Sequence, residues 1–123
     1  MFFTMNKEEI IDFFKDTYYQ IKSFSQNDII AIEGDECVAI GIVLSGSIDI
    51  KRMLSNKVIQ MTSFGPGHLF GEVIIFSDVN KYPATVISSS KSEILFISRE
   101  NFKQFTYTHP DFLEMFLRDL SNK

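Results

Sequence analysis

Between Ile21 and Ile97 the sequence changes from short apolar segments to turn residues and back about every eight to twelve positions. This regular punctuation is typical of an all-β sandwich or barrel, because every strand is short and every reversal needs a turn. We therefore expect a mainly β region over residues 21–98. The predicted strands are Ile21–Phe24, Ile29–Ile32, Ala39–Leu44, Ser47–Met53, Val58–Phe64, Ala84–Ser88 and Glu93–Ser98.

Residues with special backbone preferences separate these strands. Asn27 tolerates the left-handed conformation that a tight turn can require, and Gly34-Asp35 closes the next predicted strand. Ser45-Gly46-Ser47 lies between two aliphatic runs, where a hairpin turn is expected. Gly65-Pro66-Gly67 ends a later strand, because proline has no N–H to give to a sheet.

Helical periodicity is predicted on both sides of the β region. Within residues 1–20, Asn6 and Glu9 have the spacing of a capping box, and apolar residues follow at helical intervals. Within residues 99–123, Ser98 can cap one helix and Pro110 suits the first turn of a second. The apolar face of that second helix consists of Phe112, Leu113, Phe116, Leu117 and Leu120.

No glycine or proline interrupts the last helix before Lys123, so we expect the chain to end inside a helix, as a truncated protein would. We expect residues 1–123 to form one domain. Its parts are an N-terminal helix in 1–20, a β-roll in 21–98 and C-terminal helices in 99–123. A DNA-binding domain is not expected within these residues.

Charge and composition restrict the function classes. The 123 residues have a net charge of −4 with scattered lysines and arginines, so these residues alone should not bind DNA. The single cysteine, Cys37, excludes an intramolecular disulfide and favours a reducing compartment. No apolar run approaches the ~20 residues of a membrane helix, and the N-terminus does not resemble a signal peptide. We expect a cytoplasmic protein without membrane contact.

The segment Phe70-Gly71-Glu72-Val73-Ile74-Ile75-Phe76, followed by Tyr82-Pro83-Ala84-Thr85-Val86, resembles the phosphate-binding cassette of cyclic nucleotide-binding domains. The greatest similarity is to the sensor domains of Crp/Fnr-type bacterial transcription regulators. With the turns named above and Pro110, the resemblance extends over about residues 24–116. It implies a jelly-roll β-barrel, or β-roll, with flanking helices and a role in sensing a small-molecule effector.

The same resemblance implies a set of effector-binding residues. In the family, the cassette turn leads into a short helix whose N–H groups suit an anion. The glycine matching Gly71 permits close backbone approach, and the glutamate matching Glu72 accepts a hydrogen bond from a ribose hydroxyl. The effector-binding residues expected here are Phe70, Gly71, Glu72, Val73, Tyr82, Pro83, Ala84 and Thr85.

One position departs from the pattern of cyclic nucleotide binders. They have an arginine ten residues after the glutamate, where it pairs with the cyclic phosphate, and this chain has Tyr82 there. A phenol offers one neutral donor, whereas arginine offers a charged fork. The adjacent Lys81 should face the opposite side of an extended strand. We therefore expect an effector other than cyclic AMP.

The resemblance also implies the partners of the full-length protein. DNA is contacted through a C-terminal domain that these residues lack, and a long helix after the barrel pairs two subunits into a homodimer. We expect no enzymatic activity, no cofactor and no metal ion.

Three alternatives share parts of this pattern. A cupin-like metalloenzyme would need several histidines and a carboxylate inside its barrel, and the chain has only His68 and His109. Haem sensing would need an axial ligand, for which His68, Cys37 or a methionine are candidates without a characteristic spacing. The third alternative is a cyclic nucleotide-binding regulatory domain of another signalling protein, such as a kinase or a channel.

Overall fold

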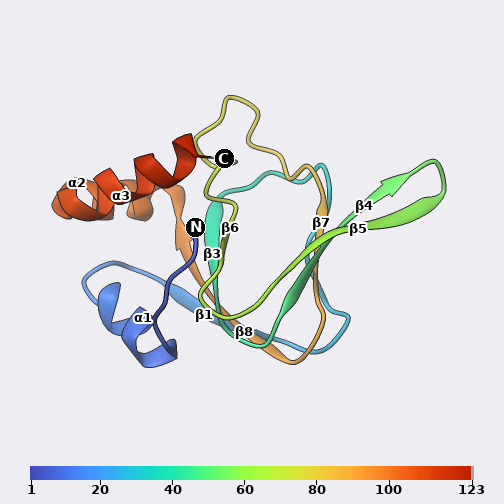
Figure 1. The fold of residues 1–123 in the computed structure, drawn as a ribbon, viewed down its shortest axis with the longest axis horizontal. Coiled ribbons are helices and arrows are strands. Elements are labelled where there is room, and N and C mark those ends of the chain that lie inside the picture. Colours follow the sequence, from blue (N-terminus) through green and yellow to red (C-terminus); the bar gives the residue numbers. More distant parts are fainter. Residues whose placement is uncertain (123) are drawn as a thin grey trace.

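The computed structural model describes residues 1–122 and contains two four-stranded antiparallel sheets with helices beside one of them (Figure 1). The first sheet has the order β1 (Gln20–Phe24), β8 (Ser92–Ser98), β3 (Ala39–Ser45) and β6 (Leu69–Phe70). The second has the order β2 (Ile29–Ala31), β7 (Thr85–Ser88), β4 (Ile48–Leu54) and β5 (Lys57–Phe64). The helices are α1 (Lys7–Phe13), α2 (Arg99–Thr108) and α3 (Pro110–Ser121).

The mainly β architecture is confirmed, but the two sheets do not close into a barrel. Strand β6 at one edge of the first sheet has two residues, and β2 at one edge of the second has three. The other two edge strands are β1 and β5, and within residues 1–122 no strand pairing joins one sheet to the other. The result is an open roll whose interior lies between two facing sheets.

The predicted strands are all present, and their boundaries differ from the prediction by no more than one residue. Strand β6 was not predicted, because two residues are too short to show an alternating pattern. It exists through tertiary pairing with β3, in which Phe70 lies opposite Gly41 and Leu69 opposite Ile42.

The helices begin where their capping residues predict. The side chain of Asn6 accepts a hydrogen bond from the Glu9 amide at 2.9 Å, and Glu9 returns one to the Asn6 amide at 3.0 Å. Ser98 caps α2, and Pro110 occupies the first turn of α3. The expected continuation of α3 to Lys123 is wrong in part. The helix ends at Ser121, the Asn122 amide bonds back to the Asp119 carbonyl, and Lys123 lies outside the described residues.

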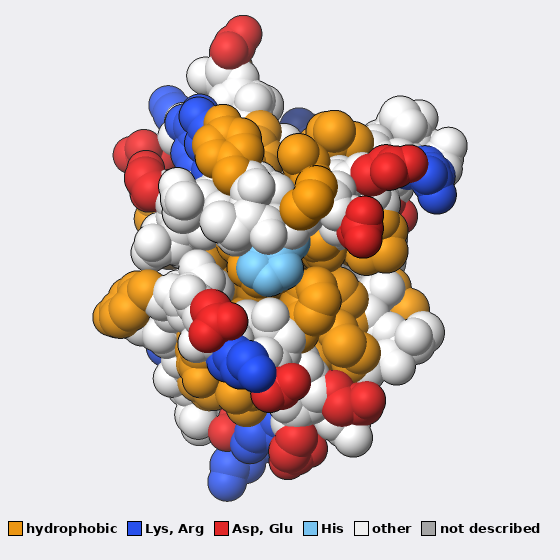
Figure 2. All heavy atoms as spheres, turned by 90° about the vertical axis from the view of Figure 1, so that its left-hand side faces the viewer, with side chains coloured by type: hydrophobic (Ala, Val, Ile, Leu, Met, Phe, Trp, Pro, Cys, Tyr) orange, Lys and Arg blue, Asp and Glu red, His pale blue; other side chains and the backbone are white. Residues whose placement is uncertain are grey.

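Two hydrophobic clusters stabilise the fold, one on each face of the first sheet. Alternation along β8 directs Leu95 and Ile97 toward the helices, and Ile94 and Phe96 toward the second sheet. The helical cluster is rich in rings, including Phe102, which is fully buried. Viewed from the helix side, the surface carries hydrophobic side chains between charged ones (Figure 2).

No helix within residues 1–122 has the length and apolar character that crossing a membrane would require.

Candidate functional site

A cavity of about 300 Å³ lies between the second sheet and the turn formed by residues 71–76, called the cassette turn below. Its walls come from β4, β5 and β6, from the turn after β6, and from the segment that leads into β7. Seven of the eight predicted effector-binding residues line it, so two segments separated in the sequence meet at one site. The lining residues are Ile50, Thr62, Phe64, Leu69, Phe70, Gly71, Glu72, Val73, Ile74, Tyr82, Pro83, Ala84 and Val86.

Thr85 is the predicted residue that does not line the cavity. Alternation in the strand directs its neighbours Ala84 and Val86 toward the cavity and Thr85 away from it. The Thr85 hydroxyl instead accepts a hydrogen bond from the Glu33 amide at 3.1 Å.

The cassette turn begins at Gly71, whose φ of +86° lies in the left-handed region that favours glycine. A Cβ atom at this position would lie 3.1 Å from the Cys37 sulfur and 3.2 Å from the Ala39 carbonyl oxygen. Both the backbone angle and the close packing therefore favour glycine.

The short helix implied by the family resemblance is not formed after Gly71. Residues 72–76 are hydrogen-bonded turns, with the amides of Ile74 and Ile75 both donating to the Gly71 carbonyl. The run Val73-Ile74-Ile75-Phe76 consists of β-branched and aromatic residues, which are weak helix formers. This turn therefore offers an incoming anion no helix dipole.

Glu72 is buried, with 4% of its surface exposed, and it carries the only charged side chain in the cavity lining. The amino group of Met1 donates to its Oε1 at 3.1 Å and lies 3.3 Å from Oδ2 of Asp119 on α3. The Met1 ammonium is thus shared between the carboxylates of Glu72 and Asp119, and it compensates the charge of Glu72 in part.

Tyr82 occupies the position where cyclic nucleotide binders have arginine, and it packs against both hydrophobic clusters. Its backbone is fixed by hydrogen bonds with Asp35 and Gly34, both at 2.9 Å. Burial, together with the hydrogen bond to Cys37, raises the pKa of the Tyr82 phenol far above its ordinary value. Burial also raises the pKa of the Cys37 thiol, although the hydrogen bond to Tyr82 opposes this. Tyr82 is therefore neutral at physiological pH. Lys81 is exposed, as predicted.

The ring of Phe70 packs directly against Gly41 of the neighbouring strand β3. A side chain at Gly41 in β3 would collide with the Phe70 ring. The ring packs edge-on against Phe96 with 6.1 Å between centroids, and it forms part of the cavity wall.

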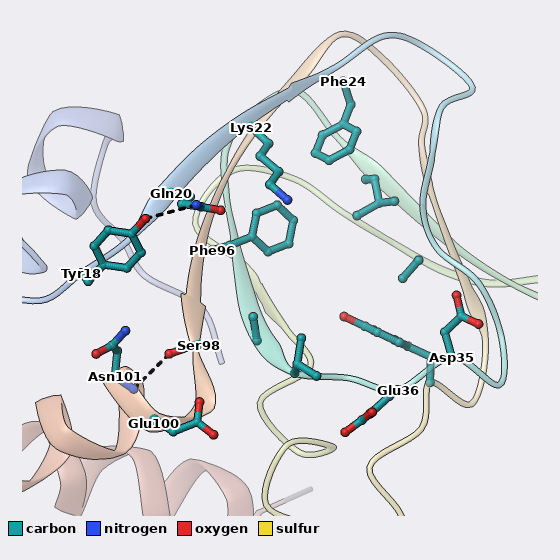
Figure 3. A pocket seen from close by; sticks show the side chains of 15 residues that line it. Tyr18, Gln20, Lys22, Phe24, Asp35, Glu36, Phe96, Ser98, Glu100 and Asn101 are labelled. Atoms are coloured by element: carbon teal, nitrogen blue, oxygen red, sulfur yellow. Dashed lines mark hydrogen bonds between the residues drawn. The ribbon is translucent and has the colours of Figure 1, made fainter.

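A second cavity of about 580 Å³ also has Tyr82 in its lining, and Figure 3 shows the side chains of its wall. Its rim is polar and includes the exposed side chains of Lys22, Glu36 and Glu100. The Lys22 ammonium lies 5.5 Å from the centroid of the Phe96 ring. This cavity is the larger of the two, but Tyr82 is the only predicted effector-binding residue that lines it. We therefore place the candidate site in the smaller cavity.

Neither histidine lines the candidate cavity, although His68 contacts the lining residue Phe64. His68 stacks on Phe64 with 4.9 Å between centroids, and His109 stacks on Phe105 at 3.9 Å. Within residues 1–122 there is no group of three or more histidine, cysteine, aspartate or glutamate side chains that could hold a metal ion.

Sequence reasoning missed the part of the cavity wall that comes from β4 and β5. Ile50, Thr62 and Phe64 belong to strands that were predicted, but the pattern did not show which strand faces the cassette. Val86 was detectable, since it alternates with the predicted Ala84.

The cyclic nucleotide-binding domain family matches residues 21–109 of the chain. A transcriptional regulator from Thermotoga maritima has a TM-score of 0.83 at 22% identity, over 96% of this chain and 88% of that one. Catabolite Activator Protein from Thermus thermophilus has a TM-score of 0.75 at 24% identity, over 97% of this chain and 57% of that one. The sensor domain of the transcriptional regulator DNR from Pseudomonas aeruginosa has a TM-score of 0.80 at 14% identity, over 94% and 89%. No curated protein matches the chain significantly.

Proposed function

The chain belongs to the cyclic nucleotide-binding domain family, and on this premise we propose that it is the effector-sensing domain of a Crp/Fnr-type bacterial transcription regulator. The effector is a small molecule other than cyclic AMP, and it binds in the cavity beside the cassette turn. The observation that carries this proposal is the convergence of Phe70–Val73 and Tyr82–Ala84 on one cavity of about 300 Å³. A cavity of this volume lies at the lower end of the range of small-molecule sites.

The lining disfavours cyclic AMP for an electrostatic reason. A cyclic phosphate carries a negative charge, and no lysine, arginine or histidine occurs among the residues that line this cavity. Glu72 adds a negative charge to the wall, and Tyr82 supplies only a neutral hydroxyl. A desolvated anion without a cationic partner is costly to bury.

Calorimetry on the isolated domain tests the assignment. Cyclic AMP and cyclic GMP should bind no more tightly than millimolar, and a metabolite library should contain a compound that raises the melting temperature. A micromolar dissociation constant for cyclic AMP would contradict the proposed effector class.

The proposal extends to the full-length regulator. The chain spans 57% of the Thermus protein, so we assign DNA contact to a domain outside residues 1–123 and pairing of two subunits mainly to a helix beyond α3. The net charge of −4 agrees with this division. In gel-shift titration at low salt, residues 1–123 should form no discrete complex with duplex DNA. Sedimentation equilibrium should find them monomeric or weakly dimeric. If residues 1–123 form a dimer with a nanomolar dissociation constant, the subunit interface must instead lie on the roll or on α1.

A further inference from the structure

The wall of the cavity beside the cassette turn contains one charged side chain, that of Glu72. Most of its lining side chains are aliphatic or aromatic, and its single ionised group, Glu72, already has the Met1 ammonium at 3.1 Å. An anionic ligand would meet Glu72 and find no cation in the lining. A cationic ligand would have to compete with an ammonium that the protein itself supplies. Ligand charge of either sign is therefore disfavoured.

Aromatic side chains contribute much of the remaining wall. Phe64, Phe70 and Tyr82 come from three different segments and all line the cavity. Phe70 and Phe64 are held from behind by ring contacts, with Phe96 at 6.1 Å and His68 at 4.9 Å between centroids. Rings fixed in this way suit a flat ligand, because offset and edge-on contacts are the arrangements that aromatic pairs prefer.

The volume of the cavity suits a small ring system. About 300 Å³ corresponds to roughly ten water molecules at ~30 Å³ each. One or two fused rings with a short substituent fit this space.

From these observations we infer that the effector is an uncharged, largely apolar molecule built on one or two fused aromatic rings. The inference rests on the proposed function, because it concerns the same cavity. The hydroxyls of Thr62 and Tyr82 are the neutral polar side-chain groups of the lining. Hydrogen bonds to these hydroxyls can orient a ligand that carries no charge.

Three compounds that share one ring and differ in charge test the inference: indole, indole-3-carboxylate and tryptamine. The chain contains no tryptophan, so the indole emission of the probes can be followed without a tryptophan background, with excitation at a wavelength that its four tyrosines scarcely absorb. Entry into an apolar cavity should shift that emission to shorter wavelength. Indole should bind at least about tenfold more tightly than either charged analogue at pH 7.

Two matched substitutions locate the binding. Ala84→Leu places a larger side chain in the cassette cavity, and Ala31→Leu makes the same change in the second cavity. We expect a loss of about tenfold or more in indole affinity for Ala84→Leu and little change for Ala31→Leu. Because Ala84 is buried, Thr62→Phe provides a second obstruction at an exposed lining position.

The outcomes separate the inference from the proposed function. If indole-3-carboxylate or tryptamine binds as tightly as indole and Ala84→Leu weakens it, the inference is overturned and the site assignment stands. If indole binds but neither Ala84→Leu nor Thr62→Phe weakens it, the ring binds outside the cassette cavity and the inference is overturned. Failure of all three probes to bind overturns the inference.

Discussion

Replacing Tyr82 with arginine should increase the affinity of the cassette cavity for cyclic nucleotides. Tyr82 lines the cavity at the position where cyclic nucleotide binders have an arginine for the phosphate. The substitution supplies the cation that the lining lacks, while the main-chain hydrogen bonds of residue 82 with Asp35 and Gly34 do not depend on its side chain. The roll should therefore still fold.

The expected change in affinity for cyclic AMP combines one favourable contribution, a new contact with the phosphate, and two unfavourable ones. A hydrogen bond to a charged group contributes about 1.5–3 kcal/mol, which corresponds to roughly 10- to 100-fold in affinity. The same burial that raises the pKa of the Tyr82 phenol will disfavour a guanidinium before ligand binds. The hydroxyl contact with Cys37 is also lost, at about 1 kcal/mol of folding free energy. We therefore expect an increase in affinity for cyclic AMP at the lower end of this range, about tenfold.

Isothermal titration calorimetry with cyclic AMP measures the effect against a matched control. Val79→Arg makes the same change in net charge at a residue that is 71% exposed and does not line the cavity. Comparing the two variants separates a local contact from a general increase in positive charge. If Tyr82→Arg folds with the wild-type circular dichroism spectrum and binds cyclic AMP no more tightly than Val79→Arg, our account of residue 82 is refuted.

Three further predictions concern stability. Phe102→Ala should reduce the free energy of unfolding by about 3–5 kcal/mol in urea titration, because Phe102 is fully buried among other rings; a loss below about 1 kcal/mol would contradict this packing. Gly71→Ala should cost about 1–3 kcal/mol, since its φ of +86° disfavours any Cβ atom; an unchanged urea midpoint would show that the turn relaxes easily. The contact of Lys7 with Glu93, at 2.7 Å, lowers the pKa of Glu93, so its stabilisation is present above the ordinary glutamate pKa and is lost as the pH falls through the lowered value. The difference in urea midpoint between wild type and Lys7→Gln should therefore disappear at low pH and in high salt, and a difference that persists would assign the effect to packing.

Local signals in the sequence were sufficient for most of the elements. The two partners of the capping box, Asn6 and Glu9, are three positions apart, and both of its hydrogen bonds are present. Strand boundaries were predictable because turn residues punctuate them.

Long-range contacts were not predictable in this way. The Met1 amino group meets Glu72 across 71 positions of sequence, and no local pattern encodes that contact. Strand β6 likewise exists only through its pairing with β3. For the site, the resemblance selected the cassette residues. The wall from β4 and β5 depends on how the two sheets face each other, which periodicity does not specify.

Gly41 influences the shape of the cassette cavity although it is not among the residues that line it. Because any side chain at this position would collide with the Phe70 ring, and that ring lines the cavity, a substitution of residue 41 should change the shape of the cavity from behind its wall. A lineage could therefore acquire a different effector through one codon change in β3 while every lining residue stayed the same. A directed-evolution library confined to the lining residues would not sample residue 41.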